Sequence, residues 1–174
     1  MATKKSNKVI EVAGDYNMDE VLLVNHEGEK TDIKRMIVEM NIYESIYKNA
    51  VTGTLVIADA QNMIVKMPIQ GTERLEFKLS TPGTSKLAHT VDATEETGHP
   101  FHIYKLTNKR QAAEGTMMYV LHFGSREFMR NLRVKVSQAY SGTMDDMVAQ
   151  IFADKNYLDS RKRLLFEPTR NSDK

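Results

Sequence analysis

The chain has 174 residues, and its 24 Lys and Arg residues against 23 Asp and Glu leave a formal net charge of +1. This length suffices for one well-buried core with an appendage. The near-neutral charge excludes the strong basic field of a duplex-binding protein, so any partner must be recognised locally. The absence of cysteine excludes disulfides, thiolate metal sites and cysteine nucleophiles, so stability must come from packing or from assembly.

The N-terminal sequence MATKKSNK precedes an apolar run much shorter than a signal-peptide core. No stretch approaches the roughly 18 apolar residues that a membrane-spanning helix needs. We therefore expect a soluble protein made in a cytoplasm. The 11 methionines suit an adaptable core or an adaptable interface, and core packing is the simpler explanation for any one of them.

Short strands with turns between them are predicted for the first part of the chain. Apolar runs at residues 9–12 and 21–24 flank a turn, and residues 26–29 form another turn. Residues 33–42 alternate with period two, which predicts one long half-buried strand. Its expected buried face is formed by Met36, Val38, Met40 and Ile42, and its polar face by Glu39 and Asn41.

Residues 52–58 are rich in β-branched residues and apolar on both faces at their centre, which predicts a strand covered on both sides. Residues 59–67 begin with an aspartate able to cap a helix and precede Pro68, so we expect a short helix or tight turn there.

The clearest alternation lies in residues 74–79. Leu75, Phe77 and Leu79 are expected to face the core, whereas Arg74, Glu76 and Lys78 are expected to face solvent. Further strands are predicted at residues 88–94, 101–107 and 117–123, with a loop over residues 108–116. Seven or eight short strands with almost no helix indicate an antiparallel barrel or sandwich.

The pattern changes after Gly124. Residues 125–132 predict a helical turn and residues 134–136 a strand. Thr143 and Asp146 form a pattern like a capping box at the start of a helix over residues 143–154. The apolar stripe expected on this helix consists of Met144, Met147, Val148, Ile151 and Phe152.

Three parts of the chain are predicted from these patterns. Residues 1–7 form a flexible tail, residues 8–127 form the β-barrel domain, and residues 128–174 begin a second, incomplete α+β domain with a strand, the helix and another strand. A helix and a strand with so little chain after them cannot form a domain alone, so we expect a fragment or a domain completed by another chain.

The candidates for metal or catalytic chemistry are weak. The five histidines are His26, His89, His99, His102 and His122. His99 and His102 have the spacing of a helical chelate, and Glu95 and Glu96 lie nearby. Proline and strand geometry, however, should point the two rings to opposite faces. His122 lies near Ser125, but the sequence lacks the glycine-flanked serine of a hydrolase elbow.

Phosphate and nucleic-acid motifs are also missing. No glycine loop with its lysine and no dinucleotide fingerprint occurs. Asp145 and Asp146 lie in the first turn of the predicted helix, where carboxylates interact favourably with the helix dipole, so they need no catalytic role. The basic run 161–163, with the aromatic residues Tyr157 and Phe166, could contact a phosphate backbone. Three basic residues are weak evidence for this, and a solvent-exposed face is the simpler explanation. We therefore predict no catalytic, cofactor or metal-binding residues, and a binding or assembly module rather than an enzyme.

A resemblance to a known family rests on an ordered series of motifs. The first is IYESIY at residues 42–47, followed by TGTLVIADAQNM at 52–63 and MPIQGTE at 67–73 before an alternating strand. FHIYKLT at 101–107, YVLHF at 119–123, Asn131, residues 134–137 and the helix from Thr143 continue the series. Over residues 8–169 the chain resembles the baseplate central hub proteins of contractile-tailed bacteriophages, which are related to hub modules of type VI secretion spikes.

This resemblance implies a tail-tube-like antiparallel β-barrel in a structural virion protein. Hub subunits of the family form a trimer with two such barrels each, and so join a sixfold tube above to a threefold spike below. The implied partners are other copies of the chain, the tail tube protein and the central spike protein. The implied location is the tail baseplate, assembled in the host cytoplasm, with no membrane contact and no direct nucleic-acid binding. Because this chain holds only one complete barrel, it is either a fragment or completes its symmetry differently.

An alternative from another class is an OB-like barrel that binds single-stranded nucleic acid or oligosaccharide. Phe101, Tyr104 and Tyr119 are the candidate stacking rings for that function. A metal-dependent enzyme that uses His99 and His102 is the third alternative.

Overall fold

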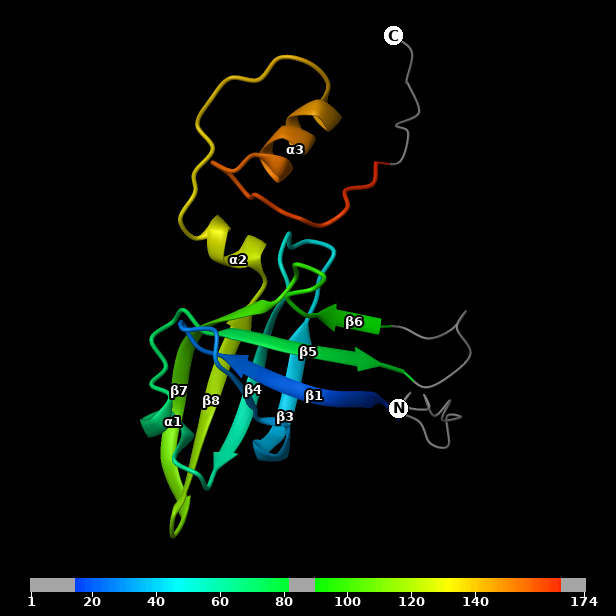
Figure 1. Ribbon diagram of the computed structural model, residues 1–174. Coiled ribbons are helices and arrows are strands. Elements are labelled where there is room, and N and C mark those ends of the chain that lie inside the picture. The colour runs from blue at the N-terminus through cyan, green and yellow to red at the C-terminus, as the bar shows by residue number, and fades with distance from the viewer. Residues whose placement is uncertain (1–14, 82–89, 167–174) are drawn as a thin grey trace.

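The computed structural model describes residues 15–81 and 90–166. Its strands pair antiparallel in one sheet of order β2-β1-β5-β7-β8-β4-β3, and β6 also pairs with β5 (Figure 1). The strands are β1 (Asn17–Val24), β2 (Lys30–Asp32), β3 (Ile37–Tyr43), β4 (Thr52–Asp59), β5 (Arg74–Ser80), β6 (Thr90–Ala93), β7 (Phe101–Ala113) and β8 (Thr116–Gly124). The helices are η1 (Lys34–Met36), α1 (Met63–Lys66), α2 (Arg126–Asn131) and α3 (Met144–Ala153).

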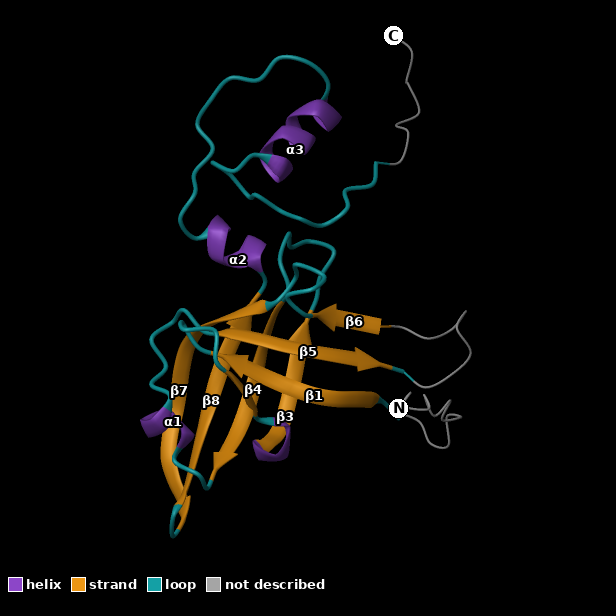
Figure 2. Cartoon of the chain, viewed as in Figure 1, coloured by secondary structure: helices purple, strands orange, loops and turns teal. Residues whose placement is uncertain are grey.

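The sheet consists of two parts that meet at a narrow junction. One part contains β2, β1, β5 and β6, and the other contains β7, β8, β4 and β3. Within the described residues, one ladder connects them, and it joins Arg74 to His102 and Leu75 to Phe101, at the start of β5 and of β7. Figure 2 shows β1 and β5 crossing over β7, β8, β4 and β3 at a steep angle. This crossing lets the inner faces of the two parts enclose one core.

Alternating strand residues fill this core. Three phenylalanines from three strands form its centre, with ring centroids 5.6 Å apart for Phe77 and Phe101 and 5.0 Å apart for Phe101 and Phe123. Other fully buried core residues are Val21, Leu23, Leu55, Ile57, Leu75, Ile103 and Leu121. The expected apolar face of residues 74–79 is thus confirmed, with Leu79 partly buried at its end.

The sheet does not close into a barrel. Within the described residues, no ladder connects β3 at one end of the strand order to β2 or β6 at the other. The mainly β, antiparallel fold is as expected, whereas the expected closure is missing. The β5–β7 junction is only two residue pairs long, and the neighbouring stretch of β5, Phe77–Ser80, pairs with β6 instead.

Two predicted elements have different bounds in the structure. The single strand expected over residues 33–42 is divided into Ile33, the 3-10 turn η1 and strand β3. A register shift between Ile37 and Glu39 turns Val38 outward, so the prediction that Val38 shares the buried face is wrong. The bulge breaks the period-two alternation on which that prediction depended.

The loop expected over residues 108–116 is mostly strand. β7 continues to Ala113, and the chain reverses at Glu114 and Gly115 to form a long hairpin with β8. Gly115 has a φ of +72°, a value that favours glycine in tight hairpin turns. The sequence did not predict this hairpin, because the outer part of β7 is polar and is exposed on both faces.

The region after Gly124 contains helices without the expected strands. α2 and α3 are present, and the capping box at Thr143 and Asp146 is confirmed. Residues 134–136 do not form a strand, so that prediction is wrong. The strand expected after the helix is not found among residues 155–166, and the rest of that region lies outside the described residues. Among the described residues, no strand pairs with residues 134–136. The predicted boundary at residue 127 falls inside α2.

The remaining predictions of secondary structure either agree with the structure or fall outside the described residues. The short helix expected within 59–67 is α1, and the turn at residues 26–29 is present. The strand expected at 21–24 is the end of β1, which begins earlier at Asn17. The tail at residues 1–7, the strand at 9–12, His89 and the start of the strand at 88–94 lie outside the described residues.

Candidate interaction surfaces

The first candidate surface is the free edge of strand β3. β3 pairs with β4 on one side, and no described strand pairs with its other side. Val38 and Tyr43 on this strand are 60% and 55% exposed, and Ile46 and Tyr47 in the loop that follows are 92% and 91% exposed. An uncovered strand edge with apolar side chains is a template for pairing with another chain.

The second candidate surface is the apolar stripe of α3. No residue of this helix is buried, and Met144 and Val148 are 70% and 40% exposed. Met147, Ile151 and Phe152 are half-buried, in part against the chain that turns back after the helix, where the Leu158 amide donates to the Ile151 carbonyl. Figure 1 shows α3 set apart from the sheet. The predicted stripe is therefore present but only partly covered within the described residues.

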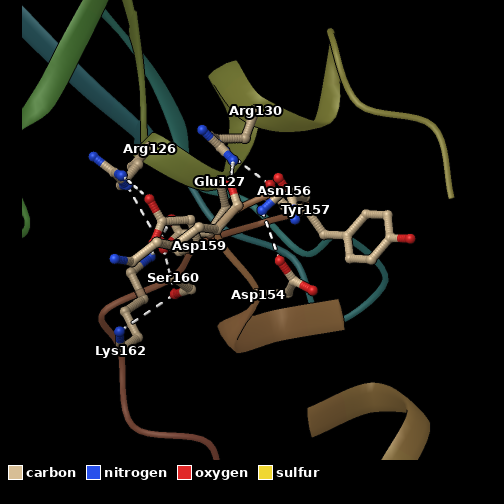
Figure 3. Close-up of polar contacts among 10 residues, drawn as sticks. Arg126, Glu127, Arg130, Asp154, Asn156, Tyr157, Asp159, Ser160 and Lys162 are labelled. Carbon is tan, nitrogen blue, oxygen red and sulfur yellow. Dashed lines mark hydrogen bonds and ion pairs between the residues drawn. The ribbon is translucent and has the colours of Figure 1, made fainter. Parts of the chain in front are cut away.

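A polar cluster attaches this region to the sheet domain (Figure 3). Glu127 on α2 is buried, accepts a hydrogen bond from the Ser160 hydroxyl at 2.6 Å and pairs with the Lys162 ammonium at 3.0 Å. Arg126 pairs with the Asp159 carboxylate, and Arg130 donates to the Tyr157 carbonyl at 2.8 Å. The chain from residue 157 to 162 is thus held on α2 by directed polar contacts.

The charges in this cluster are matched. Burial tends to raise the pKa of Glu127, but hydrogen bonds from Ser160 and its own backbone, with the Lys162 ammonium, outweigh burial and lower the pKa below its usual value. The Arg126 guanidinium lowers the pKa of Asp159 through a direct hydrogen bond. Both carboxylates are therefore ionised at neutral pH, and the cluster is an anchor rather than a proton-transfer site.

The polar face predicted for residues 74–79 is only partly exposed. Lys78 is exposed and pairs with Asp92 at 2.8 Å, and Arg74 pairs with Glu95 at 2.9 Å. Glu76 is buried, with its Oε2 2.9 Å from the ammonium of Lys30, so its predicted exposure is wrong. Glu76 lines a pocket together with residues from β1, β2 and the loop after β6, which the alternation of one strand does not reveal.

The predicted histidine candidates do not come together as a metal site. Among the described residues, no group of three or more His, Asp or Glu side chains has the geometry to hold a metal ion. Burial lowers the pKa of His102, and the nearby Arg126 and Arg74 lower it further, so this ring is neutral at pH 7. His99 lies in the loop before β7.

His122 and Ser125 have structural roles. The His122 Nε2 lies 2.8 Å from the Thr107 hydroxyl on the outer face of the sheet. Ser125 is buried and accepts a hydrogen bond from the Phe128 amide as the N-cap of α2. These contacts account for both residues without a nucleophile.

The stacking rings required by the OB-like alternative are mostly internal. Phe101 belongs to the phenylalanine core, and Tyr119 is buried with its hydroxyl 3.4 Å from Asp59 Oδ2. Burial and the Asp59 carboxylate raise the pKa of Tyr119. Tyr104 is half-buried, with its ring 4.9 Å from that of Phe128. The basic run 161–163 is partly used by the anchor through Lys162.

No protein-family model and no curated protein matches this chain. Among the described residues, no helix has the length and apolar character needed to cross a membrane.

Proposed function

We propose that this chain is a structural subunit that assembles with copies of itself, as a baseplate hub or tube-initiating subunit that adapts a tail tube to a central spike. The ordered sequence motifs supply the resemblance to contractile-tail hubs. The open antiparallel sheet supplies a physical means of assembly, since a sheet with a free edge can continue into a neighbouring copy. The tail-tube-like closure of the sheet would then form between subunits.

The observation that carries this proposal is the β3 edge. Apolar side chains gather there and in the adjoining loop, and two of them are more than nine-tenths exposed. Large exposed apolar groups beside an unpaired backbone edge are unfavourable in an isolated subunit and favourable in an assembly. The apolar stripe of α3 is a second surface of the same kind, suited to a partner above or below the ring.

Substitution at the β3 edge tests this proposal. Val38→Lys places a charge on the edge strand, whereas Val65→Lys makes the same change on α1, where Val65 is 77% exposed. We expect the wild-type protein and Val65→Lys to form rings, alone or with the tube and spike proteins. We expect Val38→Lys to be folded and mainly monomeric. Light scattering gives the mass, and negative-stain images show the rings.

Two results would contradict the proposal. A wild-type protein that stays monomeric at high concentration, both alone and with the spike protein, would exclude self-assembly as the function. Equal assembly of Val38→Lys and Val65→Lys would exclude the β3 edge as the contact surface.

A further inference from the structure

An acidic pocket lies on the outer face of the sheet part that contains β1 and β5. It has a volume of about 250 Å³ and is lined by Asp19, Glu20, Leu22, Lys30, Glu76, Phe77, Lys78, Thr94, Glu95 and Glu96. Five carboxylates and two ammonium groups give the lining a formal charge of −3. The volume is below the roughly 300–1,000 Å³ typical of small-molecule sites, so the pocket suits a single side chain.

Glu76 supplies an independent sign that this pocket receives a ligand. Its side chain is 4% exposed and its Oε2 pairs with Lys30, yet its Oε1 has no hydrogen-bond partner among the described residues. Buried carboxylate oxygens are normally paired, because an unpaired one loses its hydration without compensation. An incoming donor at Oε1 would complete the site.

The other carboxylates show that this donor should be cationic. Arg74 pairs with Glu95, whereas Asp19, Glu20 and Glu96 form no ion pair with any described residue. A guanidinium has five donors in a planar fork and can bond several carboxylate oxygens at once. An arginine side chain therefore fits the pocket better than a lysine ammonium.

The β7–β8 hairpin carries a matching group on the same chain. Lys105, Lys109 and Arg110 lie along it, are exposed and form no ion pair with any described residue, and Glu114 at the turn is its one acid. Figure 1 shows the hairpin projecting from the body at the end of the sheet away from α2, far from β6. The hairpin of one copy therefore cannot reach its own pocket.

We propose that the acidic pocket of one copy binds the Lys109–Arg110 segment of the β7–β8 hairpin of a second copy, with the Arg110 guanidinium at Glu76 Oε1. This inference rests on the proposed self-assembly and names one of its contacts. Two different surfaces meet in this contact, so it is heterologous, and repeated heterologous contacts build rings or stacks.

Charge reversal in two separate variants tests the pairing. Glu20→Lys/Glu96→Lys makes the pocket basic, and Lys109→Glu/Arg110→Glu makes the hairpin acidic. We expect each variant alone to self-associate at least about tenfold more weakly than wild type. Lys135→Glu/Lys155→Glu changes the charge as much as the hairpin variant at exposed sites elsewhere, and we expect it to associate like wild type.

Mixing the two reversed variants separates a specific contact from a general charge effect. The basic pocket of one then meets the acidic hairpin of the other, so we expect association to return in the mixture. Sedimentation velocity at low and moderate salt measures it. Cysteine placed beside each surface supplies a direct check, since the natural chain has none. Thr97→Cys and Ala112→Cys proteins, when mixed, should be joined by a short bismaleimide, whereas Lys135→Cys with Ala112→Cys should not.

The outcomes distinguish this inference from the proposed function. If all charge variants assemble as strongly as wild type, the pairing of pocket and hairpin is wrong and self-assembly still stands. The same holds if the mixture of the two reversed variants stays as dissociated as each variant alone. A monomeric wild type overturns both. If millimolar calcium chloride stabilises the protein through Glu20 and Glu96 while association is unchanged in every variant, the pocket is a cation site and the pairing is wrong.

Discussion

At the scale of single residues, Gly53 shows how closely the sheet is packed. A Cβ at this position would lie 2.4 Å from the Asn41 carbonyl oxygen and 2.2 Å from the Phe123 ring. Real Cβ atoms do not approach other atoms so closely, and the backbone of β3 cannot move without disturbing its ladder to β4. Glycine is therefore required here for space.

We expect Gly53→Ala to lower the free energy of unfolding by about 3 kcal/mol or more, since overpacking a rigid site displaces backbone as well as side chains. Urea denaturation measures this change. Thr52→Ala, on the same strand and half-buried, is the control and should cost less than about 1 kcal/mol. A Gly53→Ala protein as stable as this control would show that the close approach is not maintained in solution.

At the scale of elements, α2 connects the sheet domain to the region that carries α3. Its N-cap Ser125 continues directly from β8, and its buried Glu127 binds Ser160 and Lys162. The pKa of Glu127 is lowered in the folded state. The carboxylate therefore stabilises the fold above its unfolded pKa of about 4.3, and this contribution is lost as the pH falls through the lower, folded pKa.

We expect Glu127→Gln to lower the free energy of unfolding by about 1–3 kcal/mol at pH 7, because Lys162 loses its buried partner. The difference between this variant and wild type should shrink as the pH falls below about 4. Urea denaturation between pH 3 and pH 7 measures both. Glu114→Gln, at the exposed hairpin turn, should behave like wild type at each pH, and a pH-independent difference for Glu127→Gln would refute the assigned role of its charge.

At the scale of the whole molecule, stability is unevenly distributed. The strands β4, β5 and β8 each have neighbours on both sides and each supply at least two buried core residues, whereas α3 has no buried residue. We expect amide hydrogen exchange to be slowest in these three strands and fastest among ordered elements in α3. In assembled protein the α3 and β3 amides should gain protection. If the amides of α3 and β8 exchange equally slowly in the monomer, stability is not distributed unevenly in this way.

Elements with a strong local pattern were predictable. The alternation of Leu75 and Phe77, the cap at Thr143 and the proline after α1 each act within a few residues, so the sequence shows them directly. The burial of Glu76 was not predictable, since its partner Lys30 and the other residues around it come from elsewhere in the chain. The outward turn of Val38 depends on a bulge that its own strand pattern does not encode.

The sequence by itself determined a mainly β, antiparallel fold, its turns, the capped helix and the lack of any motif for catalysis, because periodicity and capping are local properties of the backbone. Only the tertiary structure decided that the sheet stays open, that one side of β3 pairs with no described strand, and that Glu76 is buried beside Lys30. Strand order and burial arise from contacts between residues far apart in the sequence, and the local pattern of one strand does not encode those contacts.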